Sequence, residues 1–327
     1  MLTSSDVQAA ADRIRPHVRV TPLADLDPGT FAPAARVMFK LEQVQHTGSF
    51  KVRGAFNRIL AATAEGAIPE AGVIAASGGN HGLAVAYAAA HSGGLAGGSS
   101  PRDQHSKLPA QVYVPQTAPA VKVTKLRALG ADVVQVGTRY AEAYTAAAKR
   151  AADTGALLCH PYDQPEICAG QGTLGLELLE QAGGEIDTIL VAVGGGGLMA
   201  GVATAAGTRA HVVGVEPVAI PTLSAALAAG GPVDVEVSGI AADALGATRL
   251  GDIPYAVAAA AGVESVLVED RDIIAARRLL WEDYRLVVEH GGAAAFAALL
   301  AGAYRPRAGE RIAVILCGAN TDVADLG

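Results

Sequence analysis

The sequence has few aromatic residues and few charges. Aromatic residues make up 4% and charged residues 17% of the 327-residue chain, and the net charge is −7, with acids and bases interspersed. A nucleic-acid-binding surface needs a basic patch, and an acidic tail needs a run of like charges. Neither pattern is present, so we expect small-molecule partners and no nucleic acid.

Cysteines and long apolar runs are also scarce. Cys159, Cys168 and Cys317 are odd in number and lack the spacing of a metal site, which favours reduced thiols in the cytosol over a disulfide scaffold. We expect no bound metal. Residues 1–15 contain charges and no apolar signal segment, and the apolar runs elsewhere are too short to cross a bilayer. A cytoplasmic protein with no membrane partner is therefore expected.

Apolar residues, by contrast, are plentiful at 51%, enough for the buried cores of two domains. Short β-branched runs alternate with segments of helical periodicity. These runs predict strands near residues 37–41, 73–76, 111–114, 133–136, 188–193, 212–215, 266–268 and 312–316. Because parallel neighbours need a crossover connection, the alternation predicts an α/β fold of mostly parallel sheets, with sites at the carboxyl ends of the strands.

One lysine lies at the start of a predicted helix. Apolar residues recur at helical spacing from Val52 to Leu60, so we expect a buried amphipathic helix that begins close to Lys51. The positive end of a helix and a partly apolar pocket both disfavour an ammonium, which should lower the pKa of Lys51. A neutral amine of this kind can form a Schiff base with an aldehyde.

Four consecutive glycines, Gly194-Gly195-Gly196-Gly197, separate a predicted strand from a helical stretch that begins at Leu198. Backbone N–H groups in such a turn can bind a phosphate. The same residues, with Ala200 and Glu216, also satisfy the dinucleotide fingerprint, so this element alone leaves a nicotinamide enzyme open. That alternative is disfavoured because the fingerprint normally follows the first strand of a domain and because it leaves the Lys51 segment unexplained.

Two further segments follow predicted strands. Ser77-Gly78-Gly79-Asn80-His81 lies between the strand at 73–76 and a helix expected over 83–90, where a carboxylate can dock on backbone N–H groups. Cys317-Gly318-Ala319-Asn320 follows the strand at 312–316. Because sites lie at the carboxyl ends of parallel strands, we expect both segments to border the active site.

The segment Gly48-Ser49-Phe50-Lys51-Val52-Arg53-Gly54-Ala55 resembles a stretch of the serine/threonine dehydratase family, pyridoxal-phosphate enzymes of the tryptophan-synthase-β fold type. The resemblance implies a fold of two domains, known as PLP fold type II. Residues 1–69 and 159–327 would form a large domain and residues 70–158 a small one. Residues 91–109 are rich in glycine and serine and contain Pro101 and Pro109, so we expect a mobile loop there. The resemblance also implies a homodimer, and Gly170-Gln171-Gly172-Thr173 is expected at a helix start.

The resemblance further implies roles for the site residues. Lys51 would be the catalytic residue and would bind pyridoxal 5'-phosphate covalently. The other cofactor contacts would come from Phe50, Asn80, Gly194, Gly195, Gly196, Gly197, Leu198, Gly239 and Cys317. The substrate carboxylate would bind Ser77, Gly78, Gly79, Asn80 and His81. Ser238 stands where the family usually has an acidic residue.

The implied reaction is deamination of L-threonine or L-serine, by elimination of water, to 2-oxobutyrate or pyruvate and ammonia. A racemase remains an alternative, although that branch has an acid/base serine where this chain has Gly78. A hydroxyaspartate-type dehydratase and a non-enzymatic phosphate-binding module also remain open. Glu216 matches a divalent-ion ligand of some members, but Thr222 stands where a second acidic ligand is expected.

Overall fold

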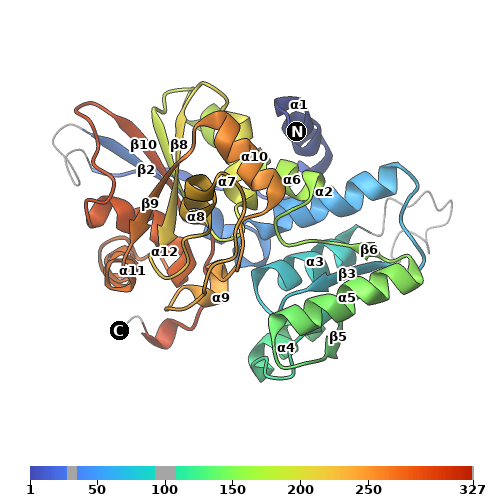
Figure 1. Ribbon diagram of the computed structural model, residues 1–327. Helices are drawn as coiled ribbons and strands as arrows, with labels where there is room; N and C mark the ends of the chain where they lie inside the picture. Colours follow the sequence, from blue (N-terminus) through green and yellow to red (C-terminus); the bar gives the residue numbers. More distant parts are fainter. Residues whose placement is uncertain (28–34, 93–107, 326–327) are drawn as a thin grey trace.

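Two sheets of mostly parallel strands, each flanked by helices, make up the molecule (Figure 1). The structure is a computed structural model, and it describes residues 1–27, 35–92 and 108–325. The chain builds part of one sheet, then the whole of the other, and then returns to complete the first.

The larger sheet has six strands in the order β1-β2-β10-β7-β8-β9. Only the β1–β2 pair is antiparallel. The strands are β1 (Leu23–Asp25), β2 (Arg36–Lys40), β7 (Thr188–Ala192), β8 (His211–Pro217), β9 (Glu264–Val268) and β10 (Arg311–Ile315).

The smaller sheet has four parallel strands in the order β5-β4-β3-β6. Its strands are β3 (Val73–Ala76), β4 (Ala110–Val114), β5 (Asp132–Gln135) and β6 (Leu157–Leu158). All eight predicted strands are therefore present, within two residues at each end. The domain boundaries at 69/70 and 158/159 stay a prediction, and most of the loop expected at 91–109 lies outside the described residues.

Helices cover the faces of both sheets. They are α1 (Ser4–Ile14), α2 (Lys51–Ala64), α3 (Asn80–His91), α4 (Ala120–Ala128), α5 (Tyr140–Thr154), α6 (Pro165–Gln181), α7 (Gly197–Ala206), α8 (Thr222–Ala229), α9 (Ala242–Leu245), α10 (Asp252–Ala261), α11 (Asp270–Tyr284) and α12 (His290–Leu300). Helix α2 contacts α3 beside the smaller sheet and α6 beside the larger one. It therefore connects the two halves of the molecule.

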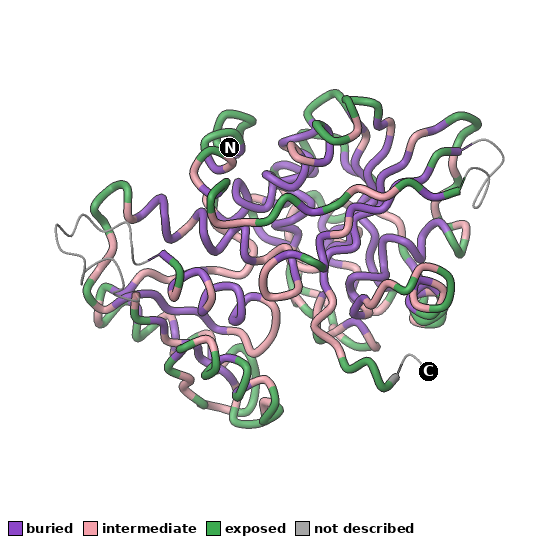
Figure 2. The backbone as a smooth tube through the Cα atoms, turned by 180° about the vertical axis from the view of Figure 1, so that it is seen from behind, coloured by how far each residue is buried: buried purple, intermediate pink, exposed green. Residues whose placement is uncertain are grey.

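The main core lies around the larger sheet, whose central strands are buried along most of their length (Figure 2). Small residues allow the helices behind it to approach closely. A Cβ atom on Gly201 of α7 would lie 2.4 Å from the backbone nitrogen of Gly172 in α6. The expectation of a helix start at Gly170–Thr173 is therefore wrong, because α6 begins at Pro165 and these glycines are mid-helix packing positions.

Candidate active site

Lys51 is the first residue of α2, as predicted. A tight turn precedes it, in which Thr47 and Gly48 both have positive φ, and the Phe50 N–H donates to the Cys317 carbonyl at 3.1 Å. The Lys51 Nζ donates to the Pro161 carbonyl at 2.7 Å. The amine is therefore held between the start of α2 and the segment that follows β6.

Burial lowers the pKa of the Lys51 amine to about 8, against the opposing influence of Cys317, Cys168 and Glu289. The predicted direction is correct. Its cause is loss of hydration, and the contribution of the helix end stays a prediction. A sizeable fraction of Lys51 is neutral near pH 8, which a nucleophile or base requires.

Most of the predicted cofactor contacts share one pocket with Lys51. Its lining residues are Phe50, Lys51, Asn80, Tyr162, Ala192, Gly194, Gly195, Gly196, Gly197, Leu198, Ala244, Leu245, Glu289 and Cys317. The pocket combines the carboxyl ends of β7 and β10 with the start of α3 from the smaller sheet. Residues far apart in the sequence thus meet at one point.

The glycine turn fits a phosphate. Gly196 has φ +87°, and a Cβ on Gly195 would lie 2.3 Å from the Tyr162 ring, so larger residues are excluded sterically. Among the described residues, the backbone N–H groups of residues 194–198 donate to no backbone or side-chain acceptor. Such a row of free donors at the start of α7 is suited to an anion.

The middle of the Ser77–His81 segment lines the adjoining space, and its end residues, Ser77 and His81, do not. Gly78, Gly79 and Asn80 line a second pocket, which shares Asn80, Ala244 and Glu289 with the first. The helix expected over 83–90 begins earlier, at Asn80, so the N–H groups of this segment lie at a helix start. The Ser77 Oγ accepts a hydrogen bond from the Gly79 N–H at 3.2 Å.

The His81 ring itself is structural. Burial lowers the pKa of His81 to about 3, with the Lys51 charge acting in the same direction. The ring is therefore neutral, and because a carbonyl can only accept, its Nε2–H donates to the Cys159 carbonyl at 2.8 Å. Only the backbone of His81 is available to a carboxylate.

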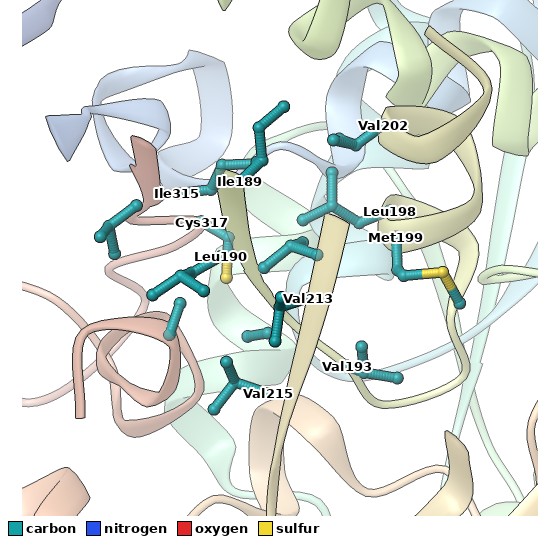
Figure 3. Close-up of a cluster of buried hydrophobic side chains, with 14 of the residues drawn as sticks. Ile189, Leu190, Val193, Leu198, Met199, Val202, Val213, Val215, Ile315 and Cys317 are labelled. Carbon is teal, nitrogen blue, oxygen red and sulfur yellow. The ribbon is translucent and has the colours of Figure 1, made fainter. Parts of the chain in front are cut away.

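Cys317 is a buried thiol at the end of β10. Burial raises the pKa of its thiol to about 12, so it stays protonated. Its Sγ lies 3.8 Å from the Gly291 carbonyl. Figure 3 shows the side chain among Ile189, Leu190 and Ile315, at the edge of the core. It offers a neutral partner to a ligand in the pocket.

Gly239 does not line the Lys51 pocket, although the following residues Ile240 and Ala241 line the adjoining one. Its φ is +82°, and the Ile240 N–H donates to the Asp270 carboxylate at 3.1 Å. Ser238 precedes this glycine at the position where the resemblance implies an acidic residue. Asp270 supplies a carboxylate beside the glycine. Contact between Gly239 and the cofactor stays a prediction.

Sequence reasoning missed Glu289. Its Oε1 accepts from the Asn80 Nδ2 at 2.6 Å, while the Asn80 Oδ1 accepts from the Asn320 Nδ2 at 2.7 Å. These two bonds fix the orientation of the Asn80 amide. Burial raises the pKa of the Glu289 carboxyl to about 7. No motif marked this residue; the only signal was its position just before an apolar helix.

Tyr162 was missed as well. It follows β6 by four residues and packs its ring against Gly195, on the wall of the Lys51 pocket. The His160 ring lies edge-on to it, with centroids 4.7 Å apart. Its position after a parallel strand could have indicated a site residue. The strand, β6, has two residues and was too short to predict from the sequence.

Glu216 does not fit a divalent-ion site. Its carboxylate accepts hydrogen bonds from three donors, the N–H groups of Leu223 and Ser224 and the Ser265 hydroxyl, and the Thr222 Oγ1 lies 3.1 Å from its Oε1. A metal would have to displace these internal donors. In the described ranges, no group of three or more His, Cys, Asp or Glu side chains is arranged to hold a metal ion.

Comparison with known proteins identifies the family. A family model described as "Pyridoxal-phosphate dependent enzyme" matches residues 14–318. L-threonine ammonia-lyase of Geobacter sulfurreducens is 38% identical over 99% of this chain and 77% of its own length. Phenylserine dehydratase of Ralstonia pickettii is 36% identical over 98% of this chain and 95% of its own. Maize serine racemase has a similar structure, with a TM-score of 0.87 and 31% identity over 99% of this chain and 95% of that one.

The chain therefore belongs to the serine/threonine dehydratase family of pyridoxal-phosphate enzymes. The predicted fold type and cofactor are confirmed, and a nicotinamide cofactor is not needed to explain the glycine turn. The site fits pyridoxal phosphate, because one pocket offers free N–H donors, an amine whose pKa is lowered to about 8 and a neutral thiol. No described helix has the length and apolar character needed to cross a membrane.

Proposed function

We propose that this chain removes water from L-threonine, L-serine or both, releasing 2-oxobutyrate or pyruvate and ammonia. The observation that carries the proposal is a buried amine, Lys51, whose pKa is lowered to about 8, in a site where position 78 offers no side chain that can exchange a proton. The similarity to threonine ammonia-lyase supports the same reaction class.

The cofactor would be held by residues that line the Lys51 pocket. Lys51 would bind its aldehyde carbon, the glycine turn and Leu198 its phosphate, and Asn80 its phenolic oxygen. The Cys317 thiol would contact the ring nitrogen, and Phe50 would lie against the ring. When bound, pyridoxal phosphate supplies an electron sink for the charge that remains on the substrate after loss of its Cα proton.

The protein's own residues bind the substrate and move its proton. The substrate carboxylate would accept hydrogen bonds from Ser77 and from the N–H groups of residues 78–81, at the positive end of α3. This contact would place the Cα–H bond near the Lys51 amine, which takes the proton as general base. The Pro161 carbonyl, 2.7 Å from Nζ, orients that amine.

Loss of the Cα proton is followed by cleavage of the Cβ–O bond. The hydroxyl leaves with a proton as water, and the resulting enamine takes up one water to give the 2-oxo acid and ammonia. Net, the hydroxyamino acid is converted to oxo acid and ammonia with no external oxidant. A thiol beside the ring nitrogen, unlike a carboxylate, leaves that nitrogen largely unprotonated, which favours elimination over transamination.

The proposal is tested by assaying oxo-acid and ammonia release from L- and D-serine, L- and D-threonine, hydroxyaspartate and phenylserine. We expect release from L-threonine or L-serine, and loss of at least about 10³-fold in Lys51→Ala. Lys149→Ala, an exposed lysine on α5, is the matched control and should retain activity. Undiminished ammonia release by Lys51→Ala would contradict the assignment.

Racemisation is the second candidate, since the chain resembles a serine racemase in structure. A Cβ on Gly78 would approach nothing closer than 3.6 Å, so a serine fits there without strain. If position 78 decides between the reactions, Gly78→Ser should raise the yield of D-serine from L-serine relative to pyruvate. Chiral chromatography measures this ratio; a large D-serine yield from the unmodified chain would favour the racemase instead.

A further inference from the structure

Thr222 makes a direct contact with the glycine turn. It is fully buried at the first position of α8, and its Oγ1 lies 2.5 Å from the Gly194 carbonyl oxygen. The same hydroxyl lies 3.1 Å from the Glu216 Oε1. A hydroxyl has one proton, and the shorter distance favours donation to Gly194.

This bond determines where the next N–H group points. In a planar trans peptide, the carbonyl of one residue and the N–H of the following residue point in opposite directions. Holding the Gly194 carbonyl toward α8 therefore turns the Gly195 N–H away from α8. Gly194 and Gly195 both line the Lys51 pocket, and the Gly195 N–H donates to no acceptor within the described part of the chain.

Glu216 in turn holds the start of α8. Its Oε1 accepts from the Leu223 N–H at 2.6 Å, and its Oε2 accepts from the Ser224 N–H at 2.8 Å and from the Ser265 Oγ at 2.8 Å. Glu216 is itself buried at the carboxyl end of β8, so the contact fixes α8 against the sheet. A carboxylate at a helix N-terminus is also electrostatically favourable.

We propose that Thr222 is a positioning residue for the cofactor phosphate. Its hydroxyl holds the Gly194 carbonyl so that the Gly195 N–H faces the phosphate, and Glu216 keeps Thr222 in place through α8. The glycine turn is thus fixed before the cofactor binds. This inference rests on the proposed placement of the phosphate at residues 194–198.

The test compares two probes on the apoenzyme: pyridoxal 5'-phosphate and pyridoxal, which lacks the phosphate. Their dissociation constants are measured by absorbance for the wild type, Thr222→Val and Thr222→Ser. We expect Thr222→Val to weaken pyridoxal phosphate about tenfold, as for a lost hydrogen bond that leaves a buried carbonyl unpaired. Pyridoxal affinity should change less than about twofold, and Thr222→Ser should restore the wild-type ratio.

The matched control is Thr204→Val, which removes a hydroxyl-to-carbonyl bond of 2.8 Å to Ala200 within α7, outside the turn. It should leave the ratio of the two constants unchanged. Equal weakening of both probes by Thr222→Val, or the same ratio change in Thr204→Val, would overturn the proposal. If Thr222→Val does not fold, Thr222→Ala provides the same comparison. Equal affinity of the wild type for both probes would instead reject the phosphate placement itself, whatever reaction the holoenzyme catalyses.

Discussion

At the scale of single residues, the site depends on side chains whose protonation is changed by burial. Lys51 is a weaker base than an ordinary lysine, while Glu289 and Cys317 are weaker acids than usual. All three line one pocket. Burial therefore increases the neutral fraction of each of these groups, and the neutral form of the Lys51 amine is the one that can bind an aldehyde and accept a proton.

The lowered pKa of Lys51 predicts the pH dependence of cofactor uptake. The ammonium form is not nucleophilic, so the rate of covalent incorporation of pyridoxal phosphate into apoenzyme should rise with pH and level off above a midpoint near 8. Stopped-flow absorbance at constant ionic strength measures this rate. A rate that keeps rising to a midpoint near pH 10, as for an exposed lysine, would show that burial does not affect the amine.

The raised pKa of Glu289 predicts a pH-dependent cost in stability. The folded state binds a proton at Glu289 with a pKa of about 7, above the ordinary glutamate value of 4.5, so folding stability falls as pH rises from about 4.5 to 7. Glu289→Gln cannot titrate. In urea unfolding of the apoenzyme, the free energy of unfolding of Glu289→Gln relative to wild type should increase between pH 5 and 7.5, by on the order of 2 kcal/mol. An identical difference at both pH values would contradict this.

Motifs identified some site residues and not others. Lys51, the glycine turn and Cys317 lie in short segments whose residue types indicate their chemistry, and all of them line the pocket. Glu289 and Tyr162 come from segments without such a pattern. They reach the pocket through tertiary packing, against Asn80 and Gly195 respectively, and a single sequence contains no information on that packing.

At the scale of elements, α2 carries more than the catalytic lysine. Arg53, in the first turn of the helix, is almost completely buried, and its Nε lies 2.5 Å from the Glu42 carboxylate. Its Nη2 lies 3.0 Å from Glu177 of α6, which also pairs with Lys40 of β2 at 2.5 Å. These buried ion pairs fix the start of α2 against the larger sheet and α6, and so fix the position of Lys51.

Removing Arg53 should be costly. Arg53→Ala leaves the buried Glu42 carboxylate without its cation, and breaking such a pair costs about 3–5 kcal/mol of unfolding free energy. Chemical denaturation monitored by circular dichroism measures the loss. Arg36→Ala is the matched control, because its pair with Asp25 is half exposed and should be worth at most about 1 kcal/mol. Equal losses in the two variants would refute the structural role of the cluster.

The long, apolar elements were the predictable ones. Eight strands follow from β-branched runs, and the apolar stripe from Val52 to Leu60 predicts α2. The strands β1 and β6 have three and two residues, too few for an alternating pattern, and depend on pairing with β2 and β3. Gly170 and Gly172 were expected at a helix start, but they lie inside α6, where close packing against α2 and α7 requires glycine.

At the scale of the whole molecule, the site joins two sheets. Asn80, from the smaller sheet's side, bonds with Glu289 and Asn320 from the larger sheet's side. The Lys122 side chain on α4 forms an ion pair with Asp243 on α9, and both residues line the adjoining pocket. The Lys51 pocket itself is lined by Asn80 from α3 and by the glycine turn before α7, so a ligand there would contact both halves at once.

Cofactor binding should accordingly stabilise both halves together. Hydrogen–deuterium exchange of apoenzyme and holoenzyme should show slower exchange at residues 78–84, at the start of α3, and at residues 194–202, at the start of α7. Residues 270–284 of α11, which do not line the Lys51 pocket, serve as the internal control. Protection confined to residues 194–202 would show that the α3 side takes no part in cofactor binding.

The most direct test concerns the covalent bond between Lys51 and the cofactor. Holoenzyme is reduced with borohydride, digested and analysed by mass spectrometry. We predict a pyridoxyl group on the peptide that contains Lys51, and none on that peptide in Lys51→Ala. A pyridoxyl group on another lysine, or on no residue after saturation with pyridoxal phosphate, would contradict the account.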